Sequence, residues 1–280
     1  MQTLNCRGNL LDLSIPKVMG IINVTPDSFY DGGKTFSETA ILKQTEKMLS
    51  EGATFLDIGG YSSRPGADEI SEDEEIRRVL GAIEAILKKF PESLISVDTF
   101  RSNVAKKAVE TGAAMVNDVS GGALDAEMYK TVANLKVPYI LMHMRGTPKT
   151  MTKLTDYKNV TVEVIKDLSE KIALARAEGI NDIIADSGFG FAKTSAQSFE
   201  LLNNLELFQN LGVPNLVGVS RKSFIYKTLE TSAENALNGT TALNTIALLK
   251  GASILRVHDV KEAVECVKLW CNVTRIKGGG

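Results

Sequence analysis

The chain has 280 residues, of which 44% are hydrophobic and 24% are charged, and its formal net charge is −2. This composition is typical of a soluble globular protein with a sizeable core, and the lack of a basic excess argues against a nucleic-acid-binding protein. Three cysteines without a CxxC pair and only two histidines argue against a disulfide framework and a zinc site. Because we find neither a signal peptide nor an apolar run long enough to span a membrane, we expect a cytoplasmic protein.

Eight short apolar runs have the length and composition of buried strands: Val18–Ile22, Thr54–Ile58, Leu94–Val97, Met115–Val119, Tyr139–Met142, Asp182–Ala185, Leu216–Val219 and Ser253–Val257. Long segments separate them, and five of these segments carry helix signals: Glu38–Ser50, Glu72–Lys89, Asn159–Ala177, Glu234–Lys250 and Val260–Leu269. The second of these helices opens with acidic residues and closes with two lysines, as the helix dipole favours. Strands that alternate with helices in this way form parallel sheets.

Eight such units in a chain of this length predict an α/β protein, a (β/α)8 TIM barrel with its active site at the C-terminal ends of the strands. An open, doubly wound sheet of six or seven strands is the alternative. We find no linker and no shift in composition, so we expect a single domain over residues 1–277. The last residues, 278–280, are three glycines, which we interpret as a disordered tail or a remnant of cloning.

A polar or charged side chain ends or closely follows each predicted strand. In chain order these are Asn23, Asp57, Asp98, Asn117 with Asp118, His143, Asp186, Arg221 with Lys222, and Arg256 with His258. A single Asp or Asn after a strand is often only a helix cap or a turn residue. The strand ends of a parallel barrel, however, meet at one mouth, so the repetition on all eight strands predicts a functional site there.

The residue types at these strand ends indicate the chemistry. We find no Ser-His-Asp set with a nucleophile elbow and no metal cage. Separated carboxylates and amides suit a flat heterocycle with N–H groups, because a carboxylate accepts two such bonds in one plane. Cationic groups at the same mouth, namely Arg64, Lys222, Arg256 and His258, suit a phosphate or pyrophosphate. Residues 187–194, SGFGFAKT, lack the glycines of a G-x-x-x-x-G-K-[ST] loop, so we expect no nucleoside triphosphate.

Eight motifs occur in order along the chain: GIINVTPDSFYDGG, DIGGYSSRPGA, SVDT, VNDVSGG, LMHMRGTP, DSGFGFAKT, VGVSRKSF and LRVHDV. Together they resemble the dihydropteroate synthase family over about residues 16–271. The resemblance implies a transferase of folate biosynthesis that joins 6-hydroxymethyl-7,8-dihydropterin pyrophosphate to p-aminobenzoate and releases pyrophosphate. It also implies Mg²⁺ as cofactor, a homodimer that pairs through helices near the C-terminus, and a target for sulfonamides.

The resemblance further implies a role for individual residues. Those expected to be catalytic are Asp98, Lys222, Asn23 and Arg256. The pterin-binding residues would be Asp98, Asn117, Asp186, Lys222, Met142, Phe191 and Arg256. Pyrophosphate would be bound by Asn23, Ser63, Arg64, Arg256 and His258, with Asn23 also on the metal. The residues for p-aminobenzoate would be Ser223, Phe29, Ser63, Pro65 and Lys222.

Two polar stretches after the first and second strands resemble the lids of this family. We expect residues 27–33 and the stretch YSSRPGA to be mobile without ligand and to exclude water from the site when they close. Two residues depart from the family pattern. Ser187 stands where the family commonly has proline, which predicts a looser loop, and Ser63 replaces a threonine beside the expected aryl ring.

Two other functions remain as alternatives. The first is a pterin-binding domain of a corrinoid methyltransferase, which would have no use for a pyrophosphate lid. The second is a homologue that binds pterin without turnover, for which Ser187 is the only support.

Overall fold

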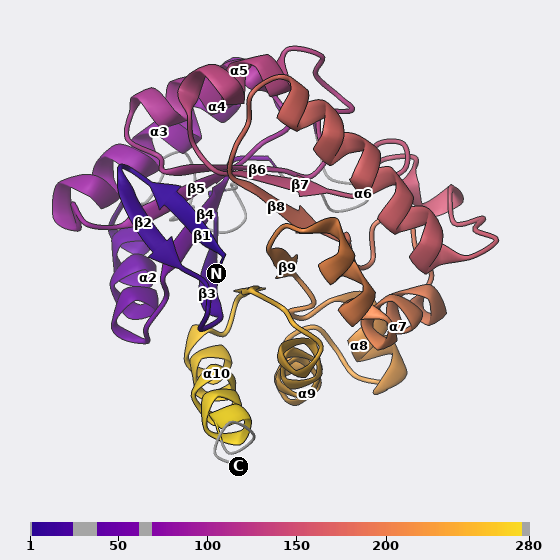
Figure 1. Cartoon of the computed structure of the whole chain (residues 1–280). Helices are drawn as coiled ribbons and strands as arrows, with labels where there is room; N and C mark the ends of the chain where they lie inside the picture. The colour runs from indigo at the N-terminus through magenta and orange to yellow at the C-terminus, as the bar shows by residue number, and fades with distance from the viewer. Residues whose placement is uncertain (1, 25–37, 62–68, 276–280) are drawn as a thin grey trace.

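The computed structural model describes residues 2–24, 38–61 and 69–275. Its central feature is a closed barrel of eight parallel strands, which confirms the predicted (β/α)8 fold (Figure 1). In barrel order the strands are β10 (Ile254–Val257), β3 (Lys17–Asn23), β4 (Phe55–Gly59), β5 (Leu94–Asp98), β6 (Met115–Asp118), β7 (Tyr139–Met142), β8 (Ile183–Asp186) and β9 (Asn215–Val217). Each predicted strand overlaps one of these, and the alternative open sheet is wrong.

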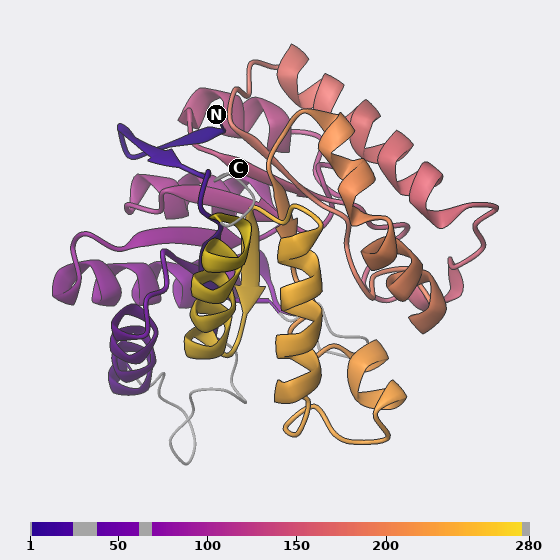
Figure 2. The same ribbon diagram turned by 60° about the horizontal axis from the view of Figure 1, so that its bottom comes forward.

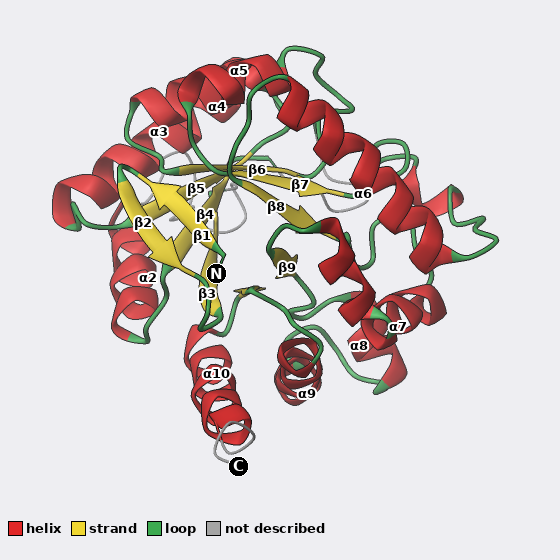
Figure 3. Cartoon of the chain, in the orientation of Figure 1, coloured by secondary structure: helices red, strands yellow, loops and turns green. Residues whose placement is uncertain are grey.

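Helices surround the barrel, as the red ribbons of Figure 3 show. They are α2 (Glu38–Ser50), α3 (Glu72–Lys89), α4 (Ser102–Glu110), α5 (Met128–Leu135), α6 (Val160–Ala177), α7 (Ser195–Asn203), α8 (Ser223–Thr228), α9 (Leu237–Leu249) and α10 (Val260–Arg275), with 3₁₀ segments at η1 (Met151–Lys153) and η2 (Leu205–Leu211). The predicted bounds of α2 and α3 are correct. Helix α9 begins later than predicted because turns at Asn235 and Ala236 precede it. The sequence did not single out α4, α5, α7 and α8, which have six to nine residues each.

A hairpin of β1 (Thr3–Cys6) and β2 (Asn9–Asp12) precedes the barrel and was not predicted. It lies across one end of the barrel, as the indigo strands of Figure 1 show. Its buried residues Leu4 and Cys6 pack with Met19 and Phe55 from the barrel interior. The hairpin therefore closes the end of the barrel at which the strands begin.

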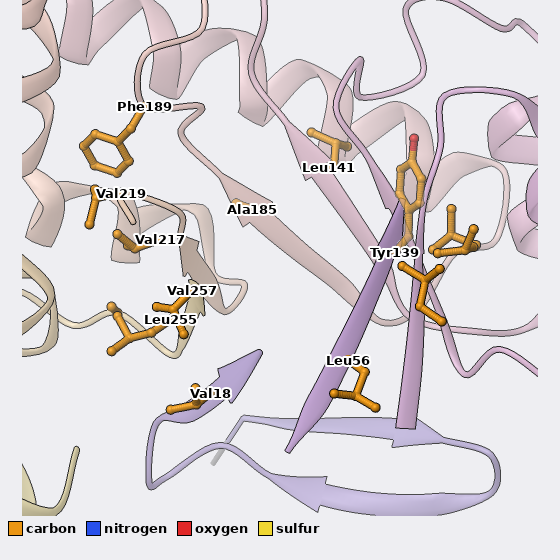
Figure 4. Packing of buried hydrophobic residues seen from close by; sticks show 14 of the residues in the cluster. Val18, Leu56, Tyr139, Leu141, Ala185, Phe189, Val217, Val219, Leu255 and Val257 are labelled. Carbon is orange, nitrogen blue, oxygen red and sulfur yellow. The ribbon is translucent and has the colours of Figure 1, made fainter. Parts of the chain in front are cut away.

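Side chains along each barrel strand alternate between two cores, as the two-residue period of a strand requires. One set, which includes Val18, Leu56 and Leu141, packs between the barrel and the helices (Figure 4). The other set, which includes Met115, points into the barrel and packs beneath the hairpin. This alternation decides which of the polar residues at the strand ends can face the mouth.

Candidate active site

The interior-facing positions change from apolar to polar along the strands. On β4, β6, β8 and β10, an apolar residue of the interior core is followed two positions later by a polar one. The four pairs are Phe55 and Asp57, Met115 and Asn117, Ile184 and Asp186, and Ile254 and Arg256. Because successive odd or even positions of a strand face the same side, these polar side chains point into the upper half of the barrel.

The strand register brings a second row of polar groups to the mouth. Asn23 is paired with Gly59, Gly59 with Asp98, and Asp98 with Asn117. Gly59 contributes no side chain to this row, and a Cβ placed there would make ordinary contacts, at 3.5 Å from Asp98 Cβ and 3.8 Å from Asn23 Oδ1. Asn23, Asp98 and Asn117 therefore lie at one level of the mouth, as the sequence predicted for a shared site.

Arg256 connects the acidic residues of this half. Its Nε donates to Asp57 Oδ2 at 2.6 Å, and its Nη2 donates to Asp98 Oδ2 at 2.7 Å. Asn117 Nδ2 donates to the same Asp57 oxygen at 2.9 Å. Asp57 is fully buried, and its other oxygen, Oδ1, makes no hydrogen bond within the described residues. Asp57 thus fixes an arginine and an amide that the sequence predicted to bind substrate.

Burial and charge shift the pKa values of this cluster. Burial raises the pKa of Asp98 to about 7, although the neighbouring Arg256 favours its charged form. The pKa of Arg256 lies above its ordinary value because Asp57 and Asp98 outweigh the effect of burial. A carboxylate with a pKa near neutrality beside a permanent cation is a feature of functional sites.

A second cluster, on β8 and the loops after β8 and β9, completes the mouth. Asp186 Oδ1 accepts the Gly188 N–H at 2.7 Å, and no hydrogen bond to its Oδ2 is found among the described residues. Lys222 Nζ donates to the Phe189 carbonyl and lies 4.6 Å from the centre of the Phe191 ring. Burial lowers the pKa of Lys222 to about 8 and raises that of Asp186. Asp186 therefore has one carboxylate oxygen without a hydrogen bond among the described residues. The neighbouring Lys222 has a pKa close enough to neutrality for its charge to change with pH.

Apolar side chains form one wall of the mouth. Met142, at the end of β7, packs in one cluster with Val119, Met144 and Phe191. Met142 is almost fully buried, whereas Phe191 is half-buried. The structure thus brings together the two residues that the resemblance assigned to the walls of the pterin pocket.

The loops after β9 and β10 are fixed to each other. Arg221 donates to both carboxylate oxygens of Asp259 at 2.8 Å, and Ser220 Oγ lies 3.0 Å from His258 Nδ1. These contacts hold His258 next to the β9–α8 loop. Helix α8 follows this loop, and its first residue, Ser223, is exposed. The ion pair of Arg221 was not predicted, although both partners are direct neighbours of predicted site residues.

Not every polar residue at a strand end faces the mouth. Asp118 points outward and accepts from Tyr139 Oη at 2.7 Å, in the core between barrel and helices. His143 pairs with the buried Lys193, at 2.8 Å between Nδ1 and Nζ. Four predicted site residues, namely Phe29, Ser63, Arg64 and Pro65, lie outside the described residues, as do the first predicted lid, the second lid after Tyr61, and the tail at residues 278–280.

The barrel with its paired charges around an open mouth defines an enzyme of the (β/α)8 class that binds a small polar substrate. A family model described as "Pterin binding enzyme" matches residues 19–258, which is most of the chain. Dihydropteroate synthase of Haemophilus influenzae is 42% identical over 262 residues, which cover 93% of this chain and 94% of the relative. The chain therefore belongs to the dihydropteroate synthase family of pterin binding enzymes.

Solved structures of this family are similar over nearly the whole chain. Dihydropteroate synthase of Xanthomonas albilineans with 4-aminobenzoic acid is 40% identical with a TM-score of 0.90, and covers 97% of this chain and 98% of its own. The same enzyme in complex with 7,8-dihydropteroate gives 38% identity and a TM-score of 0.86, with 97% and 98% covered. Both the fold and the resemblance stated from the motifs are thus confirmed.

Proposed function

We propose that the chain condenses 6-hydroxymethyl-7,8-dihydropterin pyrophosphate with p-aminobenzoate to give 7,8-dihydropteroate and pyrophosphate. One observation carries the proposal: two carboxylates on different sides of one mouth, the partly buried Asp98 and the buried Asp186, each have a cation beside them. Such a site stabilises charge that appears during a reaction. The relatives and structures that this chain matches are dihydropteroate synthases, one of them with 4-aminobenzoic acid and one with 7,8-dihydropteroate.

The pterin fits between the two clusters. Oδ2 of Asp186 would accept the N–H groups of the amino-pyrimidinone edge, and Asn117 and Lys222 would bind its polar atoms. Met142 and Phe191 would contact the apolar face of the ring. Arg256 would stack on the other face, as guanidinium planes do on flat rings. This assignment is supported by the burial of Asp186 and by its oxygen, which has no partner within the described part of the chain.

Pyrophosphate departure is the step for which the mouth is suited. The bond between the methylene carbon and the pyrophosphate oxygen breaks with its electron pair on oxygen, which leaves a cation shared with the pterin ring. Asp98, once ionised, stabilises this cation by its negative charge, while Arg256 and His258 would bind the leaving group. The amine nitrogen of p-aminobenzoate then forms the new bond to carbon and loses a proton. No enzyme nucleophile is needed, since positioning and electrostatics carry the reaction.

The residues at the mouth fit Mg²⁺. The Asn23 amide oxygen and the Asp98 carboxylate both border the space above Gly59, and within residues 2–24, 38–61 and 69–275 the Asn23 side chain has no hydrogen-bond partner. Mg²⁺ prefers oxygen ligands and is often held by one or two protein groups together with substrate phosphates. Asn23 would hold the ion with the pyrophosphate and water, and the ion would neutralise charge on the leaving group.

The aryl substrate would enter beside Lys222. Ser223 follows it directly, and its exposed hydroxyl and N–H can donate to the carboxylate of p-aminobenzoate. Phe29, Ser63 and Pro65 keep their proposed role at the aryl ring, and Arg64 and Ser63 keep theirs at the pyrophosphate. Those four residues lie outside the described ranges.

A homodimer in the cytoplasm is part of the proposal. Helices α9 and α10 pack side by side (Figures 1 and 2), and both carry exposed apolar side chains: Ile246, Leu249, Leu269 and Val273. Such residues favour an interface with a second copy. The three cysteines are free thiols, which supports a reducing compartment. No helix in the described part of the chain is long and apolar enough to cross a membrane.

The proposal is tested by Mg²⁺-dependent release of pyrophosphate from the dihydropterin pyrophosphate, with and without p-aminobenzoate. We expect net release only with p-aminobenzoate, together with dihydropteroate, and inhibition by a sulfonamide that p-aminobenzoate relieves. Pterin binding without either product would contradict the proposal and favour a non-catalytic pterin-binding protein. Transfer of a methyl group instead would favour the methyltransferase alternative.

A further inference from the structure

Lys193 is a buried lysine to which the reaction assigns no role. Its Nζ lies 2.9 Å from the Gly188 carbonyl, 3.0 Å from the Phe191 carbonyl and 2.8 Å from His143 Nδ1. The side chain therefore folds back onto its own β8–α7 loop and joins it to the end of β7. No carboxylate within the described residues lies at ion-pair distance from its Nζ, although the charge of Asp186 still acts on it from a longer distance.

These contacts are satisfied in both charge states of the amine. An ammonium donates one hydrogen to each of the three acceptors. A neutral amine donates to the two carbonyls and accepts from His143 Nδ1–H. Burial lowers the pKa of Lys193 well below its ordinary value, and lowers that of His143 to about 2, so burial favours the neutral form of both groups.

The loop that Lys193 holds has an unusual backbone path, with strain at Ala192. Gly188, Gly190 and Ala192 all have left-handed φ values, of 66°, 76° and 49°. Ala192 adopts this conformation at a steric cost, because its Cβ approaches the backbone. Gly188 also packs directly on the end of β7, since a Cβ placed there would meet the His143 carbonyl oxygen at 2.1 Å. Strain of this kind persists only where surrounding contacts enforce it.

The same loop presents three groups to the proposed pterin pocket. The Gly188 N–H donates to Asp186, the Phe189 carbonyl accepts from Lys222, and the Phe191 ring lies under the Lys222 ammonium. The far end of the loop is fixed by the capping box of Thr194 and Gln197 at α7. Lys193, near the end of the loop, thus reaches back to the carbonyls of Gly188 and Phe191 and joins them to His143 after β7.

We infer that Lys193, fixed by His143, is a positioning residue that sets the β8–α7 loop for pterin binding. The inference rests on the proposed function, because it assumes that Asp186, Phe191 and Lys222 line the pterin pocket. Lys193 does not touch the substrate: it acts through the carbonyl of Phe189 and the ring of Phe191. Its loss should therefore weaken pterin binding more than p-aminobenzoate binding, because the proposed aryl site shares only Lys222 with this loop and also uses Ser223 outside it.

The first test compares Lys193→Met with the wild type and with Lys130→Met, a control on the exposed face of α5. We expect Lys193→Met to raise KM for the dihydropterin pyrophosphate about tenfold, as for the loss of one well-placed contact, with KM for p-aminobenzoate within about twofold. Equilibrium binding of 6-hydroxymethyl-7,8-dihydropterin should weaken by the same factor. A lower melting temperature with unchanged KM values, or equal increases in both, would overturn the inference.

If Lys193→Met does not fold, a second pair of variants tests the positioning role of Lys193. In His143→Asn the side-chain amide can accept from Lys193 or donate to it in place of Nδ1, whereas the side chain of His143→Leu can do neither. We expect His143→Asn to keep pterin affinity within about twofold and His143→Leu to lose about tenfold. Equal affinities in the two variants would overturn the inference. If the wild type itself gives no dihydropteroate, the proposed function fails, while the pterin-binding measurement still judges the role of Lys193.

Discussion

The barrel interior has two halves that differ in chemistry although the same strands build both. The lower half is apolar, with Met19, Phe55 and Met115 packed beneath the hairpin of β1 and β2. The upper half holds Asp57 and Arg256 in direct contact. On β4 the change takes only two residues, from Phe55 to Asp57.

The contrast shows how one scaffold separates stability from chemistry. Apolar side chains stabilise the lower half by their removal from water. Burial of charge in the upper half opposes folding, and the pairing of Arg256 with two carboxylates offsets that cost. The lower half can therefore keep the barrel rigid while the upper half maintains charges at positions where a reaction needs them.

The largest expected effect is that of Asp98→Asn, which removes the negative charge nearest to the developing cation. We expect kcat to fall by about 10³-fold, the range found when one group that stabilises a charged transition state is lost. The dissociation constant for 6-hydroxymethyl-7,8-dihydropterin should change far less, since the amide keeps the shape of the side chain. Equal losses in kcat and in pterin affinity would place Asp98 in ground-state binding instead.

Asp57→Asn should reduce kcat/KM by about 10²-fold, because Arg256 then loses one of its two charged partners. The matched control is Asp118→Asn. Both aspartates are fully buried, but Asp118 faces outward and accepts from Tyr139 rather than from an arginine. The control should lower the free energy of unfolding while kcat/KM stays within about threefold. Similar kinetic losses in both would show that the inward position has no special role.

The pH dependence of kcat/KM should show two limbs. Asp98 loses its proton as the pH rises through about 7 and becomes the anion that the reaction needs, so the rate should increase there about tenfold per pH unit below the pKa. Lys222 becomes neutral above about 8, and the rate should fall. Lys222→Arg should abolish the alkaline limb, because arginine stays protonated. If the alkaline limb is still present in Lys222→Arg, the fall in rate is caused by the titration of another group.

The smallest effect is expected in the lower half. Phe55→Leu should reduce the free energy of unfolding by about 1 kcal/mol through lost contacts beneath the hairpin, with both KM values unchanged. Urea unfolding together with steady-state kinetics would measure this. A change in KM without loss of stability would contradict the division between the two halves.

The strands were predictable because eight apolar runs at helix-sized spacing leave few alternatives. The hairpin was missed because its strands have only four residues and its turn uses Arg7 and Gly8, both with positive φ, rather than an Asn-Gly pair. The helices that were not singled out are short, so their periodicity is weak. Sequence patterns thus predict the barrel strands and the long helices well, but not the hairpin or the short helices.

The site was predictable in its residue types but not in its pairings. The motifs indicated Arg256 and Asp98 as partners of the substrate, whereas Asp57 was only one of the polar residues at the strand ends, with no assigned role. Its contact with Arg256 joins residues 199 positions apart, which no local pattern encodes. Asn117 and Asp118 are adjacent in sequence, yet only the register shows that one faces the mouth and the other the helices.

The most direct test of the account is positional isotope exchange in the dihydropterin pyrophosphate, labelled with ¹⁸O at the bridge to carbon. During incubation with Mg²⁺ and enzyme, but without p-aminobenzoate, the pterin cation and pyrophosphate that form by cleavage can recombine. If the upper half stabilises a pterin cation and free pyrophosphate, the label should move from the bridge to non-bridging positions, and Asp98→Asn should slow this movement strongly. A label that stays in the bridge during many turnover times, in an enzyme that forms dihydropteroate normally, would contradict the account.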